Sequence, residues 1–298
     1  MLDVRKLRLL LELQARGTVT GVAQALSYSP SSVSQQLAAL EKETGVQLLQ
    51  KVGRRVQLTS QAEILVRHTA DILDLLDQAE SDLAASPTTV TGVVRVAVFQ
   101  SAAHAIVPRA LSILAGEFPD LRVEITEREP ERGLFEVAAR DFDLVIAEQY
   151  PGSTRGLRAG LDRVELATDA IRLATPEAPD ARVRATSLAE SAGLPWVMEP
   201  QGTAARIWAV QRCREAGFEP DVRYETADLI AHIRLIRSGN AVGLLPDLVW
   251  AGEQPSVRLI ELPGSPRRTV FTSARRSSAS RPGVVACRDA LSRAVPLL

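Results

Sequence analysis

Apolar residues recur at helical spacing in three successive segments at the start of the chain. The first segment ends at Gly17, and its apolar face consists of Val4, Leu7, Leu10 and Leu11. The second and third segments lie within residues 18–41 and meet at the tight sequence 27–29. Their apolar faces consist of Val22, Ala23 and Leu26 in one, and of Val33, Leu37 and Leu40 in the other. The spacing predicts three short helices, the last two joined by a tight turn.

The third of these helices is predicted to have an uncharged outer face. Ser29 suits its N-cap because the hydroxyl accepts from a free backbone N–H, and Pro30 suits the first helical position because it has no N–H to leave unpaired. The positions off the apolar stripe are short donors and acceptors, namely Ser31, Ser32, Ser34, Gln35 and Gln36. Such a face fits a helix that enters the major groove of DNA and hydrogen-bonds base edges and phosphates.

Residues 46–59 alternate between apolar and polar positions and turn at Gly53, which is typical of a small β-hairpin. Arg54 and Arg55 lie at its predicted tip. Guanidinium groups there can reach phosphates or a narrow minor groove, and the alternative is an ordinary solvated turn. The neighbouring helices and tight turn favour the contact with phosphates.

A long helix is predicted next, because neither Gly nor Pro occurs from Ser60 to Ala85. Its heptad positions are mostly apolar and read Ala62, Leu65, Thr69, Ile72, Leu76, Ala79, Leu83 and Ser86. This seam predicts a linker helix over residues 61–88 through which two copies of the chain form a homodimer. The alternative is an amphipathic helix packed on its own domain.

From residue 92 onwards, apolar runs alternate with helical patterns. Strands are expected at residues 93–99, 121–127, 143–147, 164–174, 196–198, 221–225 and 241–245. Helices are expected at about 102–117, 132–140, 204–216, 227–238 and 282–291. This order predicts a doubly wound α/β body over residues 89–298 with two lobes. Lobe I covers about 92–163 and 269–298, and lobe II about 164–268.

Charge changes this picture more than overall composition does. The 298 residues are 46% hydrophobic and 24% charged, with a net charge of −1, as in ordinary globular proteins of two or three domains. Residues 1–60 hold eight Lys and Arg against four Asp and Glu, so the head carries +4 and the remainder −5. A basic head on an acidic body suggests that only the head meets a polyanion, although chance variation in a short window is the alternative.

The chain gives no sign of export or membrane insertion. Its N-terminus is charged within the first turns and lacks the apolar core of a signal peptide, and no apolar run is long enough to cross a bilayer. Cys213 and Cys287 lie 74 residues apart without a pairing motif, as expected of reduced, buried thiols. We therefore expect a cytoplasmic protein with no membrane partner.

The first 65 or so residues resemble the winged helix-turn-helix of LysR-type transcriptional regulators. The matching residues are Thr20 and Ala23, the run SPSSVSQQLAALE at 29–41, Thr44–Gly45 and Leu58–Thr59, while Pro30 and Gln35 stand where relatives usually carry Gln and Arg. The resemblance implies that an all-α-type head over residues 1–60 binds double-stranded promoter DNA. The residues expected to contact DNA are Thr18, Thr20, Ser29, Pro30, Ser31, Ser32, Ser34, Gln35, Gln36, Arg54 and Arg55.

The body resembles the effector domain of the same family, which is built like a periplasmic binding protein. The familiar parts are RDFDLVIA, LPW and SGNAVGLLP. In such folds a ligand lies between the lobes, beyond the carboxyl ends of strands and at helix N-termini. The residues selected by this rule are Gln100, Ser101, Glu199, Gly202, Thr203 and Arg206. Free N–H groups there favour an anion, Glu199 disfavours one, and plain N-capping is the alternative role of Ser101 and Thr203.

Two other functional classes are less well supported. For an enzyme, His68, His104 and His232 are scattered, no GxSxG, P-loop or GxGxxG occurs, and Ser101 with His104 is more typical of a helix end than of a catalytic pair. A solute-binding module would lack residues 1–60 and normally carry a signal peptide. We therefore expect a regulator with no catalytic or metal site and no cofactor besides a small organic co-inducer. The family further implies assembly into homotetramers and contact with RNA polymerase.

Overall fold

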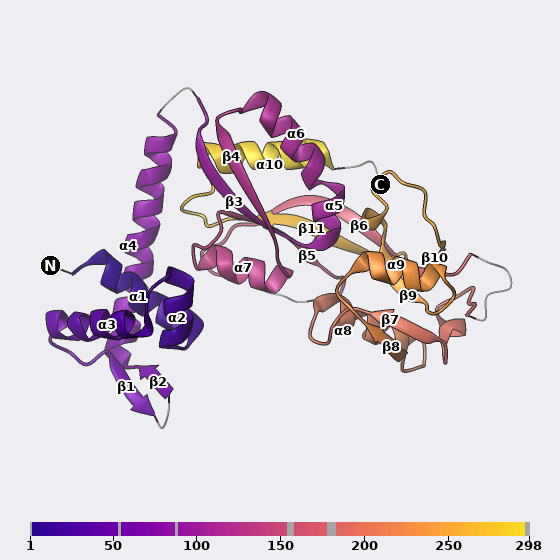
Figure 1. Ribbon diagram of the computed structural model, residues 1–298, viewed down its shortest axis with the longest axis horizontal. Helices are drawn as coiled ribbons and strands as arrows, with labels where there is room; N and C mark the ends of the chain where they lie inside the picture. The colour runs from indigo at the N-terminus through magenta and orange to yellow at the C-terminus, as the bar shows by residue number, and fades with distance from the viewer. Residues whose placement is uncertain (1, 53–54, 87–88, 154–157, 178–182, 296–298) are drawn as a thin grey trace. The chain divides into compact units, whose positions relative to one another are not determined.

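The computed structural model describes residues 2–52, 55–86, 89–153, 158–177 and 183–295, with only the backbone for Val52 and Arg55. The chain forms two compact units. The first comprises Met1–Thr88 with Ala139–Asp141, and the second comprises Thr89–Ala138 with Phe142–Leu298. The elements of both are labelled in Figure 1. In the part of the chain described, no helix is both long and apolar enough to cross a membrane.

The first unit contains the predicted three-helix head, hairpin and long helix. Its elements are α1 (Val4–Arg16), α2 (Val19–Leu26), α3 (Pro30–Thr44), β1 (Leu49–Val52), β2 (Arg55–Leu58) and α4 (Ser60–Ala84). The apolar stripes pack together into one core, whose most buried members include Leu7, Leu10, Val22, Val33, Leu37, Leu40 and Leu48. Gly17 ends α1 with φ +73°, a conformation that glycine adopts without strain.

The hairpin is fixed to the head by two polar side chains. The strands β1 and β2 run antiparallel to each other, and Leu49 pairs with Leu58. The Glu41 carboxylate, on α3, accepts from the backbone N–H groups of Leu48 (2.8 Å) and Leu49 (3.0 Å). The Thr59 hydroxyl donates to the carbonyl of Gln47 at 2.8 Å and also accepts from the N–H of Ala62, capping α4. The wing is therefore held to both α3 and α4.

The apolar seam predicted along α4 divides into two parts. Ala62 and Val66 belong to the core of the head, and Thr69 is also buried. Farther along, Leu73 is buried, but four large apolar side chains are exposed, namely Ile72, Leu75, Leu76 and Leu83, with exposed fractions of 39–74%. The first part of the seam thus packs on its own domain, and only the second part is open to another molecule.

The second unit is built on a seven-stranded sheet with the order β10-β6-β11-β5-β3-β4, and β9 pairs with β6 off this path. Its strands are β3 (Gly92–Val98), β4 (Leu121–Glu127), β5 (Leu144–Gln149), β6 (Val164–Thr175), β9 (Gly243–Pro246), β10 (Arg258–Glu261) and β11 (Arg267–Ser273). The strands β4, β3 and β5 are parallel, whereas β11 runs antiparallel to both β5 and β6.

Two lobes share this sheet through the long strand β6. Its first part pairs with β11, and its last part pairs with β9 and β10. In lobe I, α5 (Gln100–Ala105), α6 (Val107–Glu117) and α10 (Pro282–Ala294) cover one face of β3 and β5, and α7 (Pro130–Ala138) packs on the other. Lobe II adds the parallel pair β7 (Pro195–Met198) and β8 (Asp221–Glu225), the helices α8 (Ala204–Glu215) and α9 (Leu229–Arg237), and short 3-10 turns at Ala189–Ser191 and Asp247–Val249.

The structure corrects the predicted elements in two places. The helix expected over 102–117 is two helices, α5 and α6, that meet at Ile106, since Pro108 has no N–H to donate to the preceding turn. Two strands, β10 and β11, were not predicted at all. The sequence of β11 begins with Arg267 and Arg268, and two charges conceal a strand that lies in the middle of the sheet.

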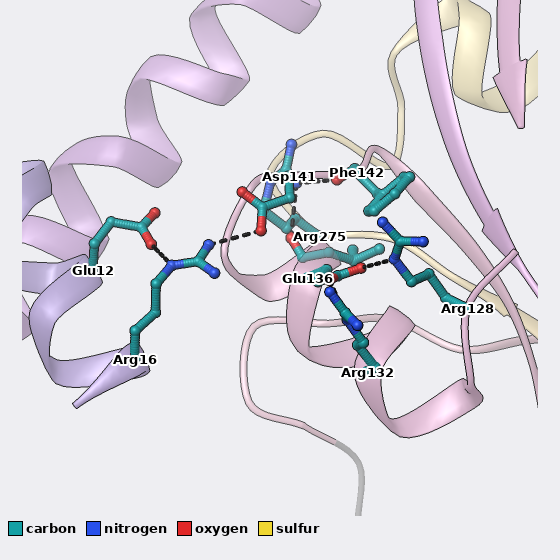
Figure 2. A network of polar contacts seen from close by, with 9 residues as sticks. Glu12, Arg16, Arg128, Arg132, Glu136, Asp141, Phe142 and Arg275 are labelled. Atoms are coloured by element: carbon teal, nitrogen blue, oxygen red, sulfur yellow. Dashed lines mark hydrogen bonds and ion pairs between the residues drawn. The ribbon is translucent and has the colours of Figure 1, made fainter. Parts of the chain in front are cut away.

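Besides its apolar packing on the sheet, α7 is held by charged side chains, which Figure 2 shows. The buried carboxylate of Glu136 accepts from Arg128 Nε at 2.9 Å and from Arg132 Nε at 2.7 Å. Arg275 donates to the backbone carbonyls of Val137 and Phe142, both at 2.9 Å. The bond to Val137 satisfies a carbonyl in the last turn of α7, and the bond to Phe142 holds the segment that follows the helix.

We predict that Gly133→Ala destabilises the second unit. A Cβ at this position of α7 would lie 2.8 Å from Val145 Cγ2 and 3.4 Å from Ala97 Cβ, both on the sheet. Overpacking of this kind should lower the free energy of unfolding by roughly 1–3 kcal/mol in urea titrations. The control is Gly116→Ala on α6, where a Cβ meets nothing within 4 Å, so that its helix propensity should leave stability unchanged or slightly higher. Equal effects of the two substitutions would contradict the close packing of α7.

Candidate functional site

The predicted DNA-contacting residues gather at the start of α3 and at the turn before it. Ser29 is the N-cap, and its hydroxyl accepts from the N–H of Ser32 at 3.1 Å. The Ser34 hydroxyl donates to the carbonyl of Pro30, and the hydroxyls of Ser29 and Ser31 lie 2.9 Å apart. The side chains exposed on this face are Pro30, Ser31, Ser34, Gln35 and Gln36, whereas Ser32 is half-buried. Because the serines bond locally, the two glutamines are the long side chains that project from this surface.

Helix α2 contributes a cap and an exposed hydroxyl. Thr18 is its N-cap and accepts from the N–H of Gly21 at 3.0 Å, while Thr20 is exposed in the first turn. The turn to α3 passes through Ser27, which adopts the left-handed conformation with φ +57°. Tyr28 follows with 51% of its surface exposed. Sequence reasoning missed Tyr28, because a residue within a turn has no place in a helical repeat, yet its phenol is suited to a phosphate.

The wing tip is the remaining part of the predicted DNA surface. Arg54 lies outside the described residues. Arg55 opens β2, and its backbone pairs with Val52. The contact of Arg54 and Arg55 with DNA phosphates therefore stays a prediction.

In the second unit, Arg268 on β11 is the centre of a buried polar cluster. Only 2% of its surface is exposed. Its guanidinium donates to Asp169 at 2.9 and 2.7 Å, to the Ser101 hydroxyl at 2.7 Å, and to Glu148. Burial alone would lower the pKa of Arg268, but the charges of Glu148 and Asp169 outweigh it and raise that pKa. The arginine therefore stays charged and joins β11 to β5, β6 and α5.

A hollow lies above this cluster, between the two lobes. Lobe I contributes Gln100, Glu127, Glu129 and Glu148, and lobe II contributes Glu199 and Leu229. The side chain of Gln100 bridges the lobes, since its Oε1 accepts from the N–H of Leu229 at 2.8 Å. Burial, with repulsion from Glu148 and Glu129, raises the pKa of Glu199 to about 8. The pKa of Glu129 is also raised, by partial burial and by neighbouring carboxylates.

A second hollow opens behind Glu199, inside lobe II. Its walls are mostly apolar and aromatic and include Tyr150, Met198, Trp208, Leu229 and His232. The rings of Tyr150 and Trp208 pack with their centroids 5.5 Å apart. Glu199 and Leu229 line both hollows, so the two meet at Glu199.

The six predicted effector residues are only partly brought together. Gln100, Ser101 and Glu199 line the hollow between the lobes, and Arg206 lines the recess behind it. The Ser101 hydroxyl is bonded to Arg268 and does not cap α5. Thr203 is the N-cap of α8, bonding the N–H of Arg206, and Gly202 forms the preceding turn with φ +91°. Neither Thr203 nor Gly202 is among the residues that line the two hollows.

Sequence reasoning missed most of the other residues of this cleft. Glu129 and Glu148 follow or end strands β4 and β5, so the same rule of strand carboxyl ends, applied to every strand, would have found them. His232 and Trp208 had no such signal, since both occupy helices, and Arg268 lies on a strand that was not predicted.

Two family models match the chain. Residues 4–63 match the bacterial regulatory helix-turn-helix protein, lysR family, and residues 87–296 match the LysR substrate binding domain. The chain belongs to the LysR family of transcriptional regulators. It is thus a DNA-binding regulator with an effector-binding domain, as the resemblance implied, and its α/β body with a helical head is the fold of that family.

Relatives cover 80–85% of the chain, and solved structures cover 98% of it. The transcriptional dual regulator GltC of Bacillus subtilis is 28% identical over 255 residues, which is 85% of this chain and 84% of that protein. A probable hydrogen peroxide-inducible genes activator of Mycobacterium avium is 29% identical, over 80% of this chain and 76% of that protein. A full-length OxyR variant from Pseudomonas aeruginosa has a TM-score of 0.68 at 17% identity, covering 98% of this chain and 95% of that one. CbnR in complex with its target DNA has a TM-score of 0.55 at 20% identity, covering 98% and 100%. These two structures share the fold.

We predict that Glu199 makes the stability of the regulator fall with rising pH. Its raised pKa means that the folded state holds a proton that the unfolded state loses above about pH 4.5. The contribution of Glu199 to the free energy of unfolding is therefore fully present below that pH and is lost as the pH rises towards about 8. The upper limit is about 1.4 kcal/mol per pH unit. Urea titrations at several pH values should show wild type losing stability relative to Glu199→Gln. A constant difference between the two proteins over this range would show that Glu199 titrates with its ordinary pKa.

Proposed function

We propose that the exposed face at the start of α3 reads promoter DNA, with the wing arginines on phosphates, and that the cleft around Glu199 binds the effector. The observation that carries the first part is the contrast between the two sides of α3. Val33, Leu37 and Leu40 are fully buried in the head, whereas Gln35 and Gln36 are exposed on a side without charge until Glu41. Glutamine can pair through two hydrogen bonds with adenine in the major groove. Gln35 and Gln36 therefore make the base-specific contacts. The serines, Thr18, Thr20 and Tyr28 contact the sugar-phosphate backbone of the DNA and so position the helix.

The second part rests on the cleft between the lobes. It lies at the carboxyl ends of strands, and Gln100 joins the two lobes across it. A small molecule bound there changes the balance between open and closed lobes, and through this the regulator's action on transcription. We propose a cytoplasmic protein, because its chromosomal target lies there, with RNA polymerase as its partner at the promoter.

We propose that two chains dimerise through the exposed part of α4, as the apolar seam predicts, and that dimers pair into tetramers. Ile72, Leu75, Leu76 and Leu83 form an unpartnered apolar stripe within the described residues of the first unit. Large exposed apolar stripes on a monomer are unfavourable in water, and a second copy would cover this one. A dimer then presents two heads to an imperfectly palindromic operator.

The signal is a bound molecule rather than oxidation of the chain's cysteines. Some relatives are named for a response to hydrogen peroxide. Here Cys213 and Cys287 are 0% and 1% exposed, lie in different apolar cores, and have pKa values raised by burial to about 12. Thiols that react with peroxide do so as accessible thiolates, which neither residue provides.

The DNA interface is tested by Gln35→Ala in fluorescence anisotropy, with DNA from upstream of the chain's own gene and with a random duplex at matched salt. Loss of a base contact should weaken operator binding by about tenfold or more and leave random binding almost unchanged. The control is Gln14→Ala, which removes an equally exposed glutamine from α1. If wild type binds the upstream DNA no more tightly than the random duplex, specific recognition is refuted. If Gln35→Ala weakens binding to both DNAs equally, Gln35 contacts the DNA backbone and not a base.

The dimer is tested by Ile72→Glu combined with Leu76→Glu. Charges in an apolar seam should separate the dimer in sedimentation velocity and weaken operator binding by about tenfold or more, because the two heads are no longer linked. The control is Val285→Glu, which places a charge on a half-exposed position of α10. An unchanged mass of the α4 variant at micromolar concentration would show that the chains associate by another surface.

A further inference from the structure

The two hollows of the effector domain meet at a single ionisable side chain. Glu199 stands between the polar hollow of the lobe boundary and the apolar recess of lobe II. The outer hollow holds only about 20 Å³ and the recess about 30 Å³, room for one or two waters each, so a molecule that occupies both must widen them as it passes the carboxylate of Glu199. Its two ends would meet very different surroundings, one charged and one apolar.

The outer hollow is lined mainly by acidic side chains. Four carboxylates contribute to its lining, namely Glu127, Glu129, Glu148 and Glu199, against the single cation Arg268. The guanidinium of Arg268 is already bonded to Glu148, Asp169 and Ser101, so it has little capacity left for a ligand. At the helix N-terminus expected to attract an anion, one N–H is already bonded, because Thr203 accepts from the N–H of Arg206. The guanidinium of Arg206 donates to the carbonyl of Glu199 at 3.2 Å.

Two residues that line the recess, His232 and Trp208, each have a buried polar atom with no partner among the described residues. His232 is 2% exposed, and its Nε2 lies 2.8 Å from the carbonyl oxygen of Thr226. A carbonyl only accepts, so Nε2 carries the proton and Nδ1 is a bare acceptor, for which the structure gives no donor. Trp208 is 4% exposed, and its Nε1–H is unpaired among the described residues. Buried polar atoms are normally satisfied, so these two atoms mark a place where another molecule or water belongs.

We infer that the effector is an organic amine, whose ammonium group binds the carboxylates of Glu199 and Glu129 while its apolar part enters the recess beside Tyr150 and Trp208. This inference rests on the proposed function of the cleft. An ammonium group offers three donors and a positive charge, which suits a site made of carboxylates and a histidine acceptor. The carboxylates come from both lobes, so one bound cation would draw the lobes together.

Two other ligand classes fit less well. An anion would meet four carboxylates in the outer hollow and find Arg268 already bonded. A metal ion would need a compact set of ligands, and over the described ranges no group of three or more His, Cys, Asp and Glu side chains is arranged to hold one. The apolar walls of the recess likewise favour a ligand with a carbon chain over a bare ion.

The pKa of Glu199 supplies a signature that separates these classes. At about 8, it leaves most of the free protein with a neutral Glu199 near pH 7, whereas an ammonium group binds the ionised form and displaces the proton. Amine affinity should therefore rise between about pH 7 and pH 9, and anion affinity should fall. The pKa of His232 is lowered by burial and that of Tyr150 is raised by burial, so neither changes charge in this range. The groups that surround Glu199 are Glu129, Glu148, Tyr150, Arg206, Glu225, His232 and Arg268.

The test uses three probes of equal size in calorimetric titrations of the full chain: butylammonium, 1-butanol and butyrate. A primary alkylamine stays charged at both pH values, as Lys does with a pKa of about 10.4. Butylammonium should bind at least about tenfold more tightly than butyrate and gain about fivefold to tenfold in affinity from about pH 7 to pH 9. Glu199→Gln should abolish that gain and weaken amine binding about tenfold. It should fold normally, because Gln resembles the neutral carboxyl that wild type carries near pH 7. The control is Glu253→Gln, at an exposed position of lobe II.

Butyrate binding more tightly than butylammonium would overturn the inference, as would no detectable butylammonium binding or equal amine affinity in wild type and Glu199→Gln. Operator binding measured on the same preparations keeps the two proposals apart. Specific operator binding without amine binding would leave the DNA-binding part of the proposed function intact and remove only the amine. Amine binding that requires Glu199, without any preference for the operator, would support the ligand class and refute the specific-operator part.

Discussion

The effector domain depends on the buried charge of Arg268. Its guanidinium joins four elements that are distant in sequence, because Ser101 belongs to α5, Glu148 to β5, Asp169 to β6 and Arg268 itself to β11. Asp169 also accepts from the N–H of Leu248, which brings a fifth segment to the same point. A cation in such a place is stable only while its carboxylates remain, and a carboxylate without it would be a buried, unpaired charge. The cluster therefore makes the paired strands β6 and β11 the rigid part of the domain.

The same cluster explains what the sequence could and could not predict. The head was predictable because each of its helices carries its own apolar stripe, and Val33, Leu37 and Leu40 pack where their spacing requires. The parallel strands β3 and β5 were predictable as continuous apolar runs. Strand β11 was not, because the sequence RRTVFTS places Arg268 in the protein interior, and only the partners on β5 and β6 make that position tolerable. A charge that is compensated across the fold leaves no local pattern.

The candidate site divides along similar lines. Residues next to a helix start, such as Ser29, Thr18 and Thr203, are visible in sequence because capping is a local property, and each of them caps the expected helix. The cleft is different, because its character comes from side chains that meet only in the fold. Ser101 was expected to offer its hydroxyl to a ligand, but this hydroxyl accepts a hydrogen bond from Arg268. The negative charge of the cleft arises from carboxylates on three separate strand ends, so the sequence left the sign of the ligand's charge open.

The arrangement of rigid and breakable contacts limits how an effector can act. Opening the lobes would leave the bonds of Arg268 to Ser101, Glu148 and Asp169 in place, since these lie at the crossing strands, but it would break the bond from the N–H of Leu229 to Gln100, which spans the cleft. A neutral amide bonded to a backbone N–H contributes only about 0.5–1.5 kcal/mol, so this bond by itself holds the lobes together only weakly. Above about pH 8, where Glu199 is ionised, repulsion between Glu129 and Glu199 opposes closure further. A ligand that changes the balance must bind one state better than the other, and a group that neutralises both carboxylates does so only when the lobes are together.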